Sequence, residues 1–533
     1  MTMTPEIIQQ RRWAILGVLV LSLLVVVLDT SILNVALKTL AEPKPEGLGA
    51  TQTDLEWATN AYTLAFAGLL FTFGILGDRI GRKKVLLGGL VAFGISSLLS
   101  AYSQTPTELI GARALMGISG AAVLPSTLSI ISNVFQPHER AKAIGIWAGA
   151  VGLALAIGPI TGGILLAHFW WGSIFLVNVP IVIVAVGLMF YLVPDSRNPN
   201  PGRLDPLGVI LSITGITAFV FGIVRGGDIG WGAPQAWVTM LLGIGLLISF
   251  ILWERRAPSP ILDVKLFRSR PFSAAVAIIG LSFFALMGLI FFLSFYLQAA
   301  RDYSPLQAGL LLLPLAVGQF AFSSRSAGFV QRFGAKRMTA IGLGLMAIAF
   351  AYYVTAGAHS SLWLLEIALF MQGVGIANVM PPSTSAIMAS VPREKAGEGS
   401  AIGNTMRQLG AALGVAILGS VLASSYRGQI TPHLQHIPAL AHASTASLHD
   451  ISSSITGTLA FAAQAGPAGQ ALVAPAVAAF IHAMHYAAAG SAVVAIIGII
   501  VALMWLPGRV KAPAPTPTTA EEASAHDHVL IEA

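Results

Sequence analysis

The sequence predicts an all-α integral membrane protein with fourteen transmembrane helices, arranged as two six-helix halves and an inserted two-helix hairpin. Only 10% of its 533 residues are charged and 55% are hydrophobic, whereas about 25% of the residues in a soluble domain are charged. Fourteen apolar runs approach or exceed the roughly 20 residues that cross a bilayer. Short motifs also recur about 255 residues apart, which indicates an internal repeat.

The composition excludes several other classes of protein. The net charge is +7, but the cations lie in short loops between apolar runs. We therefore interpret them as orientation signals and not as a nucleic-acid surface. The sequence contains no cysteine, so disulfides and thiolate metal sites are excluded. Arg11 and Arg12 precede an apolar run without a small-residue cleavage site, so we expect an uncleaved first span.

The apolar runs define the predicted spans and their orientation. They cover residues 13–38, 54–76, 85–103, 107–132, 143–167, 173–194, 206–225, 236–253, 273–299, 306–330, 338–356, 361–389, 401–424 and 482–506. An even number of spans leaves both termini on one side. Loops on that side hold 22 of the 30 Lys and Arg residues, so the positive-inside rule predicts that this side is cytoplasmic. The expected location is the inner membrane of a bacterium.

The repeat predicts the domain organisation. The loop Gly74–Lys84 has a weaker copy at Gly328–Arg337, and Pro137–Ala141 resembles Pro392–Ala396. Both copies enter from the same side, so the two halves form a parallel repeat. The predicted segments are a cytoplasmic N-terminus (1–12), an N-terminal bundle (13–194), an inserted hairpin with its linker (195–272), a C-terminal bundle (273–506) with an outer loop that contains short helices (425–481), and a disordered tail (507–533).

Two short motifs resemble motifs of a known family. The run Gly-Asp-Arg-Ile-Gly-Arg-Lys at 77–83 resembles the signature loop of the major facilitator superfamily, between spans 2 and 3. Arg113 with Gly117 resembles that family's span 4 motif, although Met116 stands where the motif usually has Gln. The resemblance implies the major facilitator fold, with a cavity between two rocking halves.

Two further motifs narrow the resemblance. Span 5 carries a glycine-rich pattern similar to the family's antiporter motif, with Ala154 in place of one glycine; its residues are Gly145, Gly158, Pro159, Gly162 and Gly163. The stretch Leu28–Leu37 looks like the span 1 motif of the fourteen-span drug:proton antiporters. This resemblance implies an exporter driven by a proton gradient.

Three charged residues are candidates for proton or substrate coupling. Asp29 lies deep in span 1, where a carboxylate costs about 2.5–3.5 kcal/mol on insertion scales. We expect it to bind a proton or a cationic substrate, and the alternative is a structural ion pair. Arg113 in span 4 lies at a similar depth. The resemblance implies that spans 1 and 4 are neighbours, so a pair with Asp29 is expected, either as a switch or as a permanent bond. Glu366 near the outer end of span 12 is either a second site or a solvated edge residue.

Other residues are candidates for gating. Asp78, Arg79, Gly81 and Arg82 are expected to form a cytoplasmic latch, and the alternative is positive-inside anchoring. The span 5 glycines and Pro159 permit a close helix contact and a kink. The resemblance places that contact with span 10, and ordinary helix packing is the alternative.

The expected substrate cavity is lined by spans from both halves. Its candidate residues are Asn34, Trp57, Tyr62, Phe295 and Gln372. The histidines His433, His436, His442 and His449 in the outer loop fit no standard metal-site spacing, so no metal is predicted.

The predicted function is therefore proton-coupled export of amphipathic or cationic drugs and antibiotics, by alternating access. The alternative is export of a single endogenous metabolite, lipid or peptide. A channel would require rings of charged groups or carbonyls, and the single deep acids and the two-half repeat argue against it. An enzyme would require a nucleophile–base set or a cofactor loop, and the sequence contains neither of these two features. We expect a monomer without a cofactor, with protons, a small molecule and membrane lipid as partners and no nucleic acid.

Overall fold

The computed structural model describes residues 5–197, 205–257, 262, 264–391, 396–434, 448 and 451–508. Every regular element in these ranges is a helix, which confirms the all-α prediction. Twelve helices are long and apolar enough to cross a membrane, and a thirteenth is counted if both parts of α2 (Gln52–Ile80) form one span. Within α5 (Pro137–His168), the stretch Ile157–His168 is a shorter apolar helix. The count of fourteen stays a prediction.

The N-terminal half consists of seven helices. Thr51 starts α2 with a capping box that includes Asp54. Gly81 separates α2 from α3 at a φ of 117°, a conformation that residues with a side chain rarely adopt. The helices are α1 (Pro5–Ala41), α2, α3 (Arg82–Ala101), α4 (Pro106–Val134), α5, α6 (Ser173–Leu176) and α7 (Asn178–Leu192).

The C-terminal half repeats this arrangement with longer extensions. Its helices are α10 (Arg270–Phe295), α11 (Pro305–Leu311), α12 (Leu313–Phe333), α13 (Ala335–Thr355), α14 (Leu362–Ser390), α15 (Ala396–Leu434), α17 (Ile455–Gln464), α18 (Gly466–Gln470) and α19 (Val473–Trp505). A 3-10 turn (η1, Val264–Arg268) precedes α10, and a π-helical turn (η2, Tyr296–Ala300) extends it.

The predicted outer loop contains more helix than the apolar pattern indicates. α15 continues to Leu434, α19 begins at Val473, and α17 and α18 lie between them. Apolar side chains buried in the main core extend into this segment, including Tyr426, Ile430 and Ile455. The helices α15 and α19 therefore extend beyond the predicted spans 401–424 and 482–506, because helices that project beyond the bilayer no longer need an apolar surface all round. The repeat motif at 392–395 and the tail beyond 508 lie outside the described residues.

The inserted hairpin packs beside the junction of the two halves. It consists of α8 (Pro206–Ile229) and α9 (Pro234–Glu254), which pack against each other. α8 also contacts α2 of the N-terminal half and α15 of the C-terminal half. A small apolar cluster with Leu64, Val220 and Ala416 among its members joins these three helices. The predicted domain boundaries at 194 and 272 themselves stay predictions.

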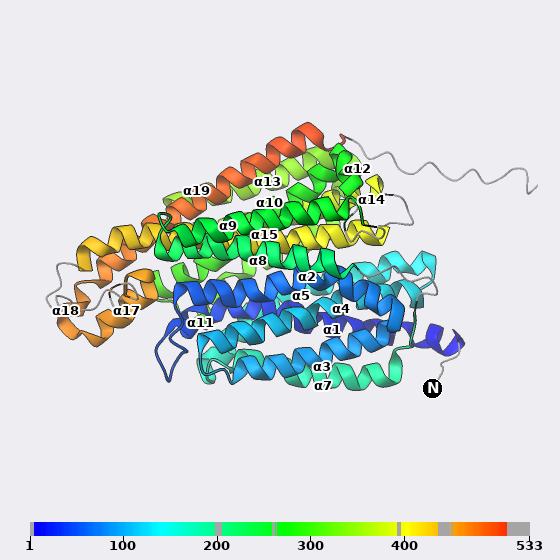
Figure 1. The fold of residues 1–533 in the computed structure, drawn as a ribbon, viewed down its shortest axis with the longest axis horizontal. Coiled ribbons are helices and arrows are strands. Elements are labelled where there is room, and N and C mark those ends of the chain that lie inside the picture. Colours follow the sequence, from blue (N-terminus) through cyan, green and yellow to red (C-terminus); the bar gives the residue numbers. More distant parts are fainter. Residues whose placement is uncertain are drawn as a thin grey trace, which may run out of the picture.

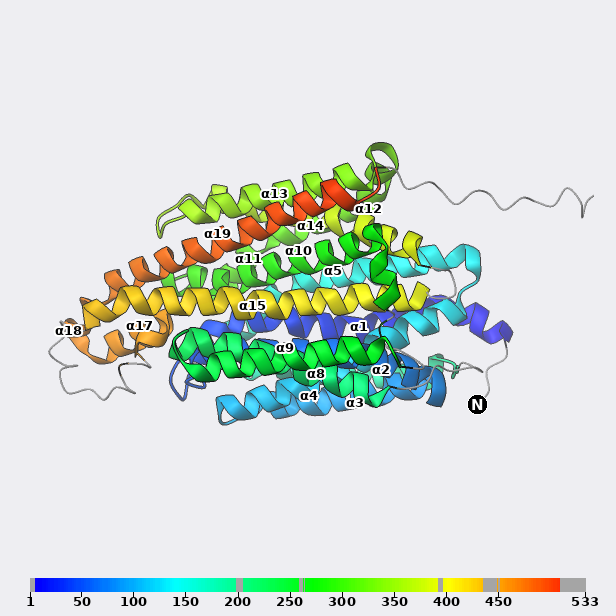
Figure 2. The same ribbon diagram turned by 45° about the horizontal axis from the view of Figure 1, so that its top comes forward.

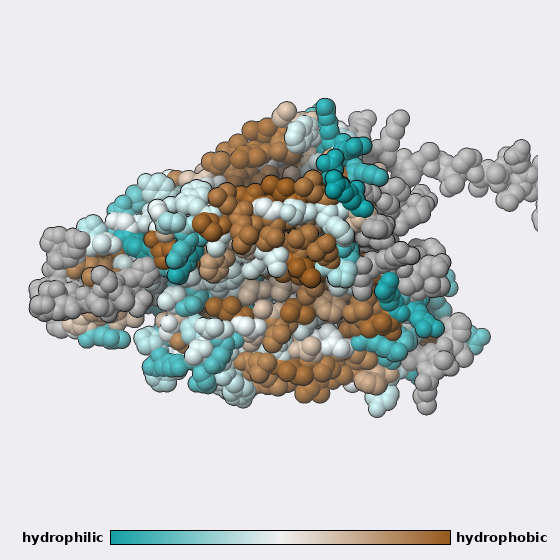
Figure 3. Space-filling view, in the orientation of Figure 1, coloured by the Kyte–Doolittle hydropathy of each residue, from teal (hydrophilic) through white to brown (hydrophobic). Residues whose placement is uncertain are grey.

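The helices run roughly along one direction, and the bundle has two distinct ends. Figures 1 and 2 show that α1 begins and α19 finishes at the same end, which we call the termini end. The helices α17 and α18 lie at the opposite end, which we call the far end. Between the ends, much of the molecular surface visible in Figure 3 is apolar, and many hydrophilic residues gather toward the ends. This distribution fits a bundle with its middle in lipid.

Candidate functional site: a buried ion pair and two helix contacts

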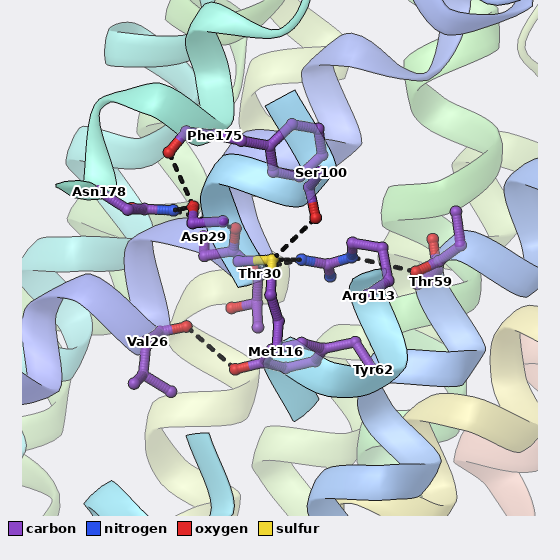
Figure 4. A network of polar contacts seen from close by, with 12 residues as sticks. Val26, Asp29, Thr30, Thr59, Tyr62, Ser100, Arg113, Met116, Phe175 and Asn178 are labelled. Carbon is purple, nitrogen blue, oxygen red and sulfur yellow. Dashed lines mark hydrogen bonds and ion pairs between the residues drawn. The ribbon is translucent and has the colours of Figure 1, made fainter. Parts of the chain in front are cut away.

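The candidate site centres on an ion pair between α1 and α4. Asp29 is 0% exposed and Arg113 is 1% exposed. The Arg113 Nη1 atom donates to Asp29 Oδ2, and the guanidinium points directly at the carboxylate in Figure 4. Arg113 Nε also donates to the Ala58 carbonyl of α2 at 3.1 Å. The pair expected from the sequence is therefore present.

A second layer of side chains holds this pair in place. The Asn178 amide of α7 donates to Asp29 Oδ1 at 3.2 Å and contacts Ser97 Oγ of α3 at 3.1 Å. The Arg113 guanidinium carbon lies 4.5 Å from the centroid of the Tyr62 ring, which is a cation–π distance. The pair is thus supported by α2, α3 and α7 in addition to its own helices.

The Asp29–Arg113 pair is chemically suited to binding a proton at Asp29. A buried ion pair is retained only when the remaining hydrogen-bonding capacity of both groups is satisfied. Here Asp29 accepts from two side chains, and Arg113 donates to a carbonyl as well. A proton on Asp29 would remove the charge that holds the guanidinium. The contact between Asn178 and Asp29 was not predicted, because the two residues are 149 positions apart in the chain.

The predicted latch residues lie together at the termini end. Arg82 Nη2 and Nε contact Asp78 Oδ1 at 2.8 and 2.9 Å. A Cβ added at Gly81 would lie 2.9 Å from Asp195 Oδ1, and the Arg82 amide donates to the Ser196 carbonyl at 2.8 Å. This loop is therefore joined to the segment after α7. Arg79 is exposed.

The span 5 glycines make the predicted close contact with the start of span 10, and they also pack closely against α1. A Cβ at Gly158 would lie 1.8 Å from Ser31 Oγ of α1, and one at Gly162 would lie 3.3 Å from Ile32. A Cβ at Gly163 would lie 2.5 Å from the Leu306 Cα of α11, the first part of the predicted span 10. From the other side, a Cβ at Gly309 would lie 2.4 Å from the Pro159 carbonyl oxygen. The side-chain surroundings at Gly145 lie outside the described residues.

These contacts belong to a junction of the halves at the far end. Gln298 donates to the Val35 carbonyl at 2.8 Å, and Lys38 Nζ lies 3.9 Å from Asp302 Oδ1. Together with the α5–α11 contact, they connect the N-terminal and C-terminal halves near the ends of α1 and α10. We call this region the far-end seam.

The remaining predicted residues do not gather at one point. Trp57 packs against Phe221 of α8, with ring centroids 5.8 Å apart, and Phe295 packs against Phe291 in the core. Glu366 is half-buried. The Asn34 amide donates to the Thr30 carbonyl of its own helix at 3.0 Å, and Gln372 is fully buried in α14.

Sequence reasoning missed two features of the interior. The Arg407 guanidinium of α15 lies 5.6 Å from the Phe283 ring centroid and within electrostatic range of Tyr62 on α2. Glu56 lies at the edge of its predicted span, where an acid is expected to reach water, but it is 2% exposed. The signal available for Glu56 was its spacing of four residues from Gln52 and Asn60.

Comparison with known proteins settles the family. The family model of the Major Facilitator Superfamily matches residues 19–415 of this sequence. The chain belongs to the major facilitator superfamily. It is consequently a multi-pass membrane transporter and not an enzyme, and the two groups of helices are the two halves of the major facilitator fold.

Several curated major facilitator proteins are similar over most of their length. The chain is 37% identical to the multidrug efflux pump LfrA of Mycolicibacterium smegmatis, over 80% of this chain and 84% of that protein. It is 35% identical to the methyl viologen resistance protein SmvA of Salmonella typhimurium strain LT2, over 79% and 84%. It is 32% identical to the tetracenomycin C resistance and export protein of Streptomyces glaucescens, over 78% and 76%.

Solved structures share the major facilitator fold at low sequence identity. A bacterial homologue of the human lysosomal transporter Spinster matches with a TM-score of 0.67 and 16% identity, over 94% of this chain and 99% of that one. A D-xylose–proton symporter matches with a TM-score of 0.58 and 15% identity, over 93% and 98%. At this identity the likeness concerns the fold alone.

Proposed function

We propose that this chain is a proton-driven antiporter that exports amphipathic or cationic drugs and antibiotics from bacteria. It would lie in the inner membrane with its termini end in the cytoplasm, as a monomer of the fourteen-span drug:proton type. The observation that carries the proposal is the fully buried Asp29–Arg113 pair. An ionisable residue within a transmembrane helix marks an ion or substrate pathway more often than a structural element.

The proposed coupling step is a change of partner at Arg113. Protonation neutralises Asp29, and the guanidinium then keeps the Ala58 carbonyl and the Tyr62 ring as its neighbours. Because these lie on α2 while Asp29 lies on α1, the proton weakens one helix contact and leaves the other. A bistable helix pair of this kind can bias the rocking of the two halves.

The names of the relatives support a drug substrate. They include an efflux pump for many drugs, a methyl viologen resistance protein and an antibiotic export protein. Methyl viologen is a cation, which agrees with a proposed exporter of cationic compounds. The competing proposal is a single endogenous metabolite, lipid or peptide, and breadth of substrate distinguishes the two.

The test is uptake of a fluorescent cationic dye into inverted membrane vesicles under an imposed proton gradient. We expect uptake by the wild type and none by Asp29→Asn, with both proteins folded by size-exclusion chromatography. The control variant is Glu46→Gln, which neutralises an exposed acid in the loop between α1 and α2. Full uptake by Asp29→Asn would refute the role of Asp29. No uptake by folded wild type would favour the single-substrate exporter.

A further inference from the structure

A polar stripe on α2 follows the seam between the halves. Gln52, Glu56 and Asn60 are spaced by four residues, so they lie on one face of the helix. They are 5%, 2% and 0% exposed. This face is directed at α15, since a Cβ added at Gly419 would lie 2.5 Å from Glu56 Oε1. Three adjacent polar residues buried between the halves are unexpected in a purely structural contact.

Among the described residues, no cation pairs with Glu56 to compensate its charge. Its one hydrogen bond in the described part of the chain is from the Gln52 amide, at 3.5 Å. The charged group that acts on it from α8 is Asp228, which is also an acid. Asp228 in turn binds Arg225 at 3.1 Å and Arg427 at 3.8 Å. The nearby cations are therefore engaged by another carboxylate, in contrast to Arg113 at Asp29.

Burial of a lone carboxylate is far less costly when the group is neutral. An unpaired charge in a low-dielectric interior is penalised by several kcal/mol, and the usual response is to take up a proton. The tight fit at Gly419 leaves no space for a hydration shell around the carboxylate. Closure of α2 against α15 therefore favours a protonated Glu56, and separation of these helices favours a charged, hydrated one.

The far end also holds a small cavity one helical turn from Glu56, next to Gln52. It is lined by Tyr426 of α15 and by Ser453 and Ser454, which precede α17. Gln52 lines this cavity and also donates to Glu56. On the inner side of Glu56, both amide atoms of Asn60 are buried without a hydrogen-bond partner among the described residues. The polar stripe of α2 thus runs from this cavity into the interior.

We propose that Glu56 is a second proton-binding site, which takes up its proton as α2 and α15 close the far end of the molecule. The inference rests on the proposed proton-driven function and places a proton-binding step at the side from which protons would enter. Because protonation of Glu56 is linked to closure, the ratio of molecules with an open far end to molecules with a closed far end rises with pH. The rise is up to about tenfold per pH unit in the range where Glu56 titrates.

The test uses the absence of native cysteine to place a single reporter. Ala423→Cys introduces a thiol into the cavity beside Gln52. Its alkylation rate by a membrane-impermeant maleimide is measured on the full-length protein in nanodiscs, from pH 5 to pH 9, without substrate. Each rate is divided by that of the unfolded protein at the same pH, because the thiolate fraction also changes with pH. Glu56→Gln, Glu56→Asp and Glu46→Gln are each combined with the reporter.

We expect the normalised rate to rise with pH in the reporter protein and in its Glu46→Gln variant, which removes an exposed acid of the same end. Glu56→Gln should abolish the rise, and Glu56→Asp should restore it with a shifted midpoint. A flat wild-type profile, or a Glu56→Gln profile that rises like the wild type, would overturn the proposal. Because no dye or gradient is used, the result is independent of whether the protein exports drugs.

Discussion

At the residue scale, the buried acids Asp29 and Glu56 differ in how their charge is balanced. Asp29 has a guanidinium and an amide on its two oxygens. Glu56 has one long hydrogen bond and an acidic neighbour. A charge with a partner can stay buried, whereas a charge without one must be neutralised or exposed. We therefore expect removal of the partner at the first site to be costly.

Replacement of Arg113 tests this expectation. Arg113→Met leaves Asp29 charged in the interior, so it should lower the free energy of unfolding by about 3–5 kcal/mol. The double variant Asp29→Asn, Arg113→Met should recover much of that loss, because no lone charge remains. Thermal unfolding in detergent measures both. If the two single losses simply add in the double variant, the residues do not act as a pair.

At the element scale, small residues determine how closely α5 approaches its neighbours. Gly158 and Gly162 face α1, and Gly163 faces the start of α11. One helix therefore contacts its own half and the opposite half within two turns. Such close approach favours backbone packing, which is the main source of helix association in lipid.

Gly163→Ala is the corresponding test. Its methyl group would meet the Leu306 Cα at 2.5 Å and the Leu306 nitrogen at 2.9 Å. Since backbone atoms cannot yield easily, we expect a loss of about 1–3 kcal/mol and a lower transport rate. Gly88→Ala in α3 is the matched control, with open space around its Cβ position. Equal behaviour of the two variants in thermal unfolding and dye uptake would contradict the assigned contact.

At the scale of the whole molecule, the halves are joined at the far end by Gln298–Val35, Lys38–Asp302 and the α5–α11 contact. α1 begins and α19 finishes at the opposite end. With the termini end in the cytoplasm, as we propose, the far-end seam would close the outer side of the transporter. The direction of export depends on this orientation.

The orientation is tested with single cysteines in a chain that has none. Glu46→Cys lies in an exposed loop at the far end, and Gly508→Cys follows α19 at the termini end. We expect an impermeant maleimide to label the first variant in intact cells and the second only after permeabilisation. The reverse pattern would show that the cation bias was misread.

The apolar runs and the cation bias were enough to predict an all-α membrane protein with two related halves, because lipid forces every spanning segment to be long, apolar and helical. The motifs also led to Asp29, Arg113 and the span 5 glycines. Only the tertiary structure brought Asn178 to Asp29 and enclosed Glu56 against Gly419. The sequence pattern indicates where a residue lies along its own helix. Whether an acid is buried depends on which other helix packs over it, and that helix is distant in the sequence.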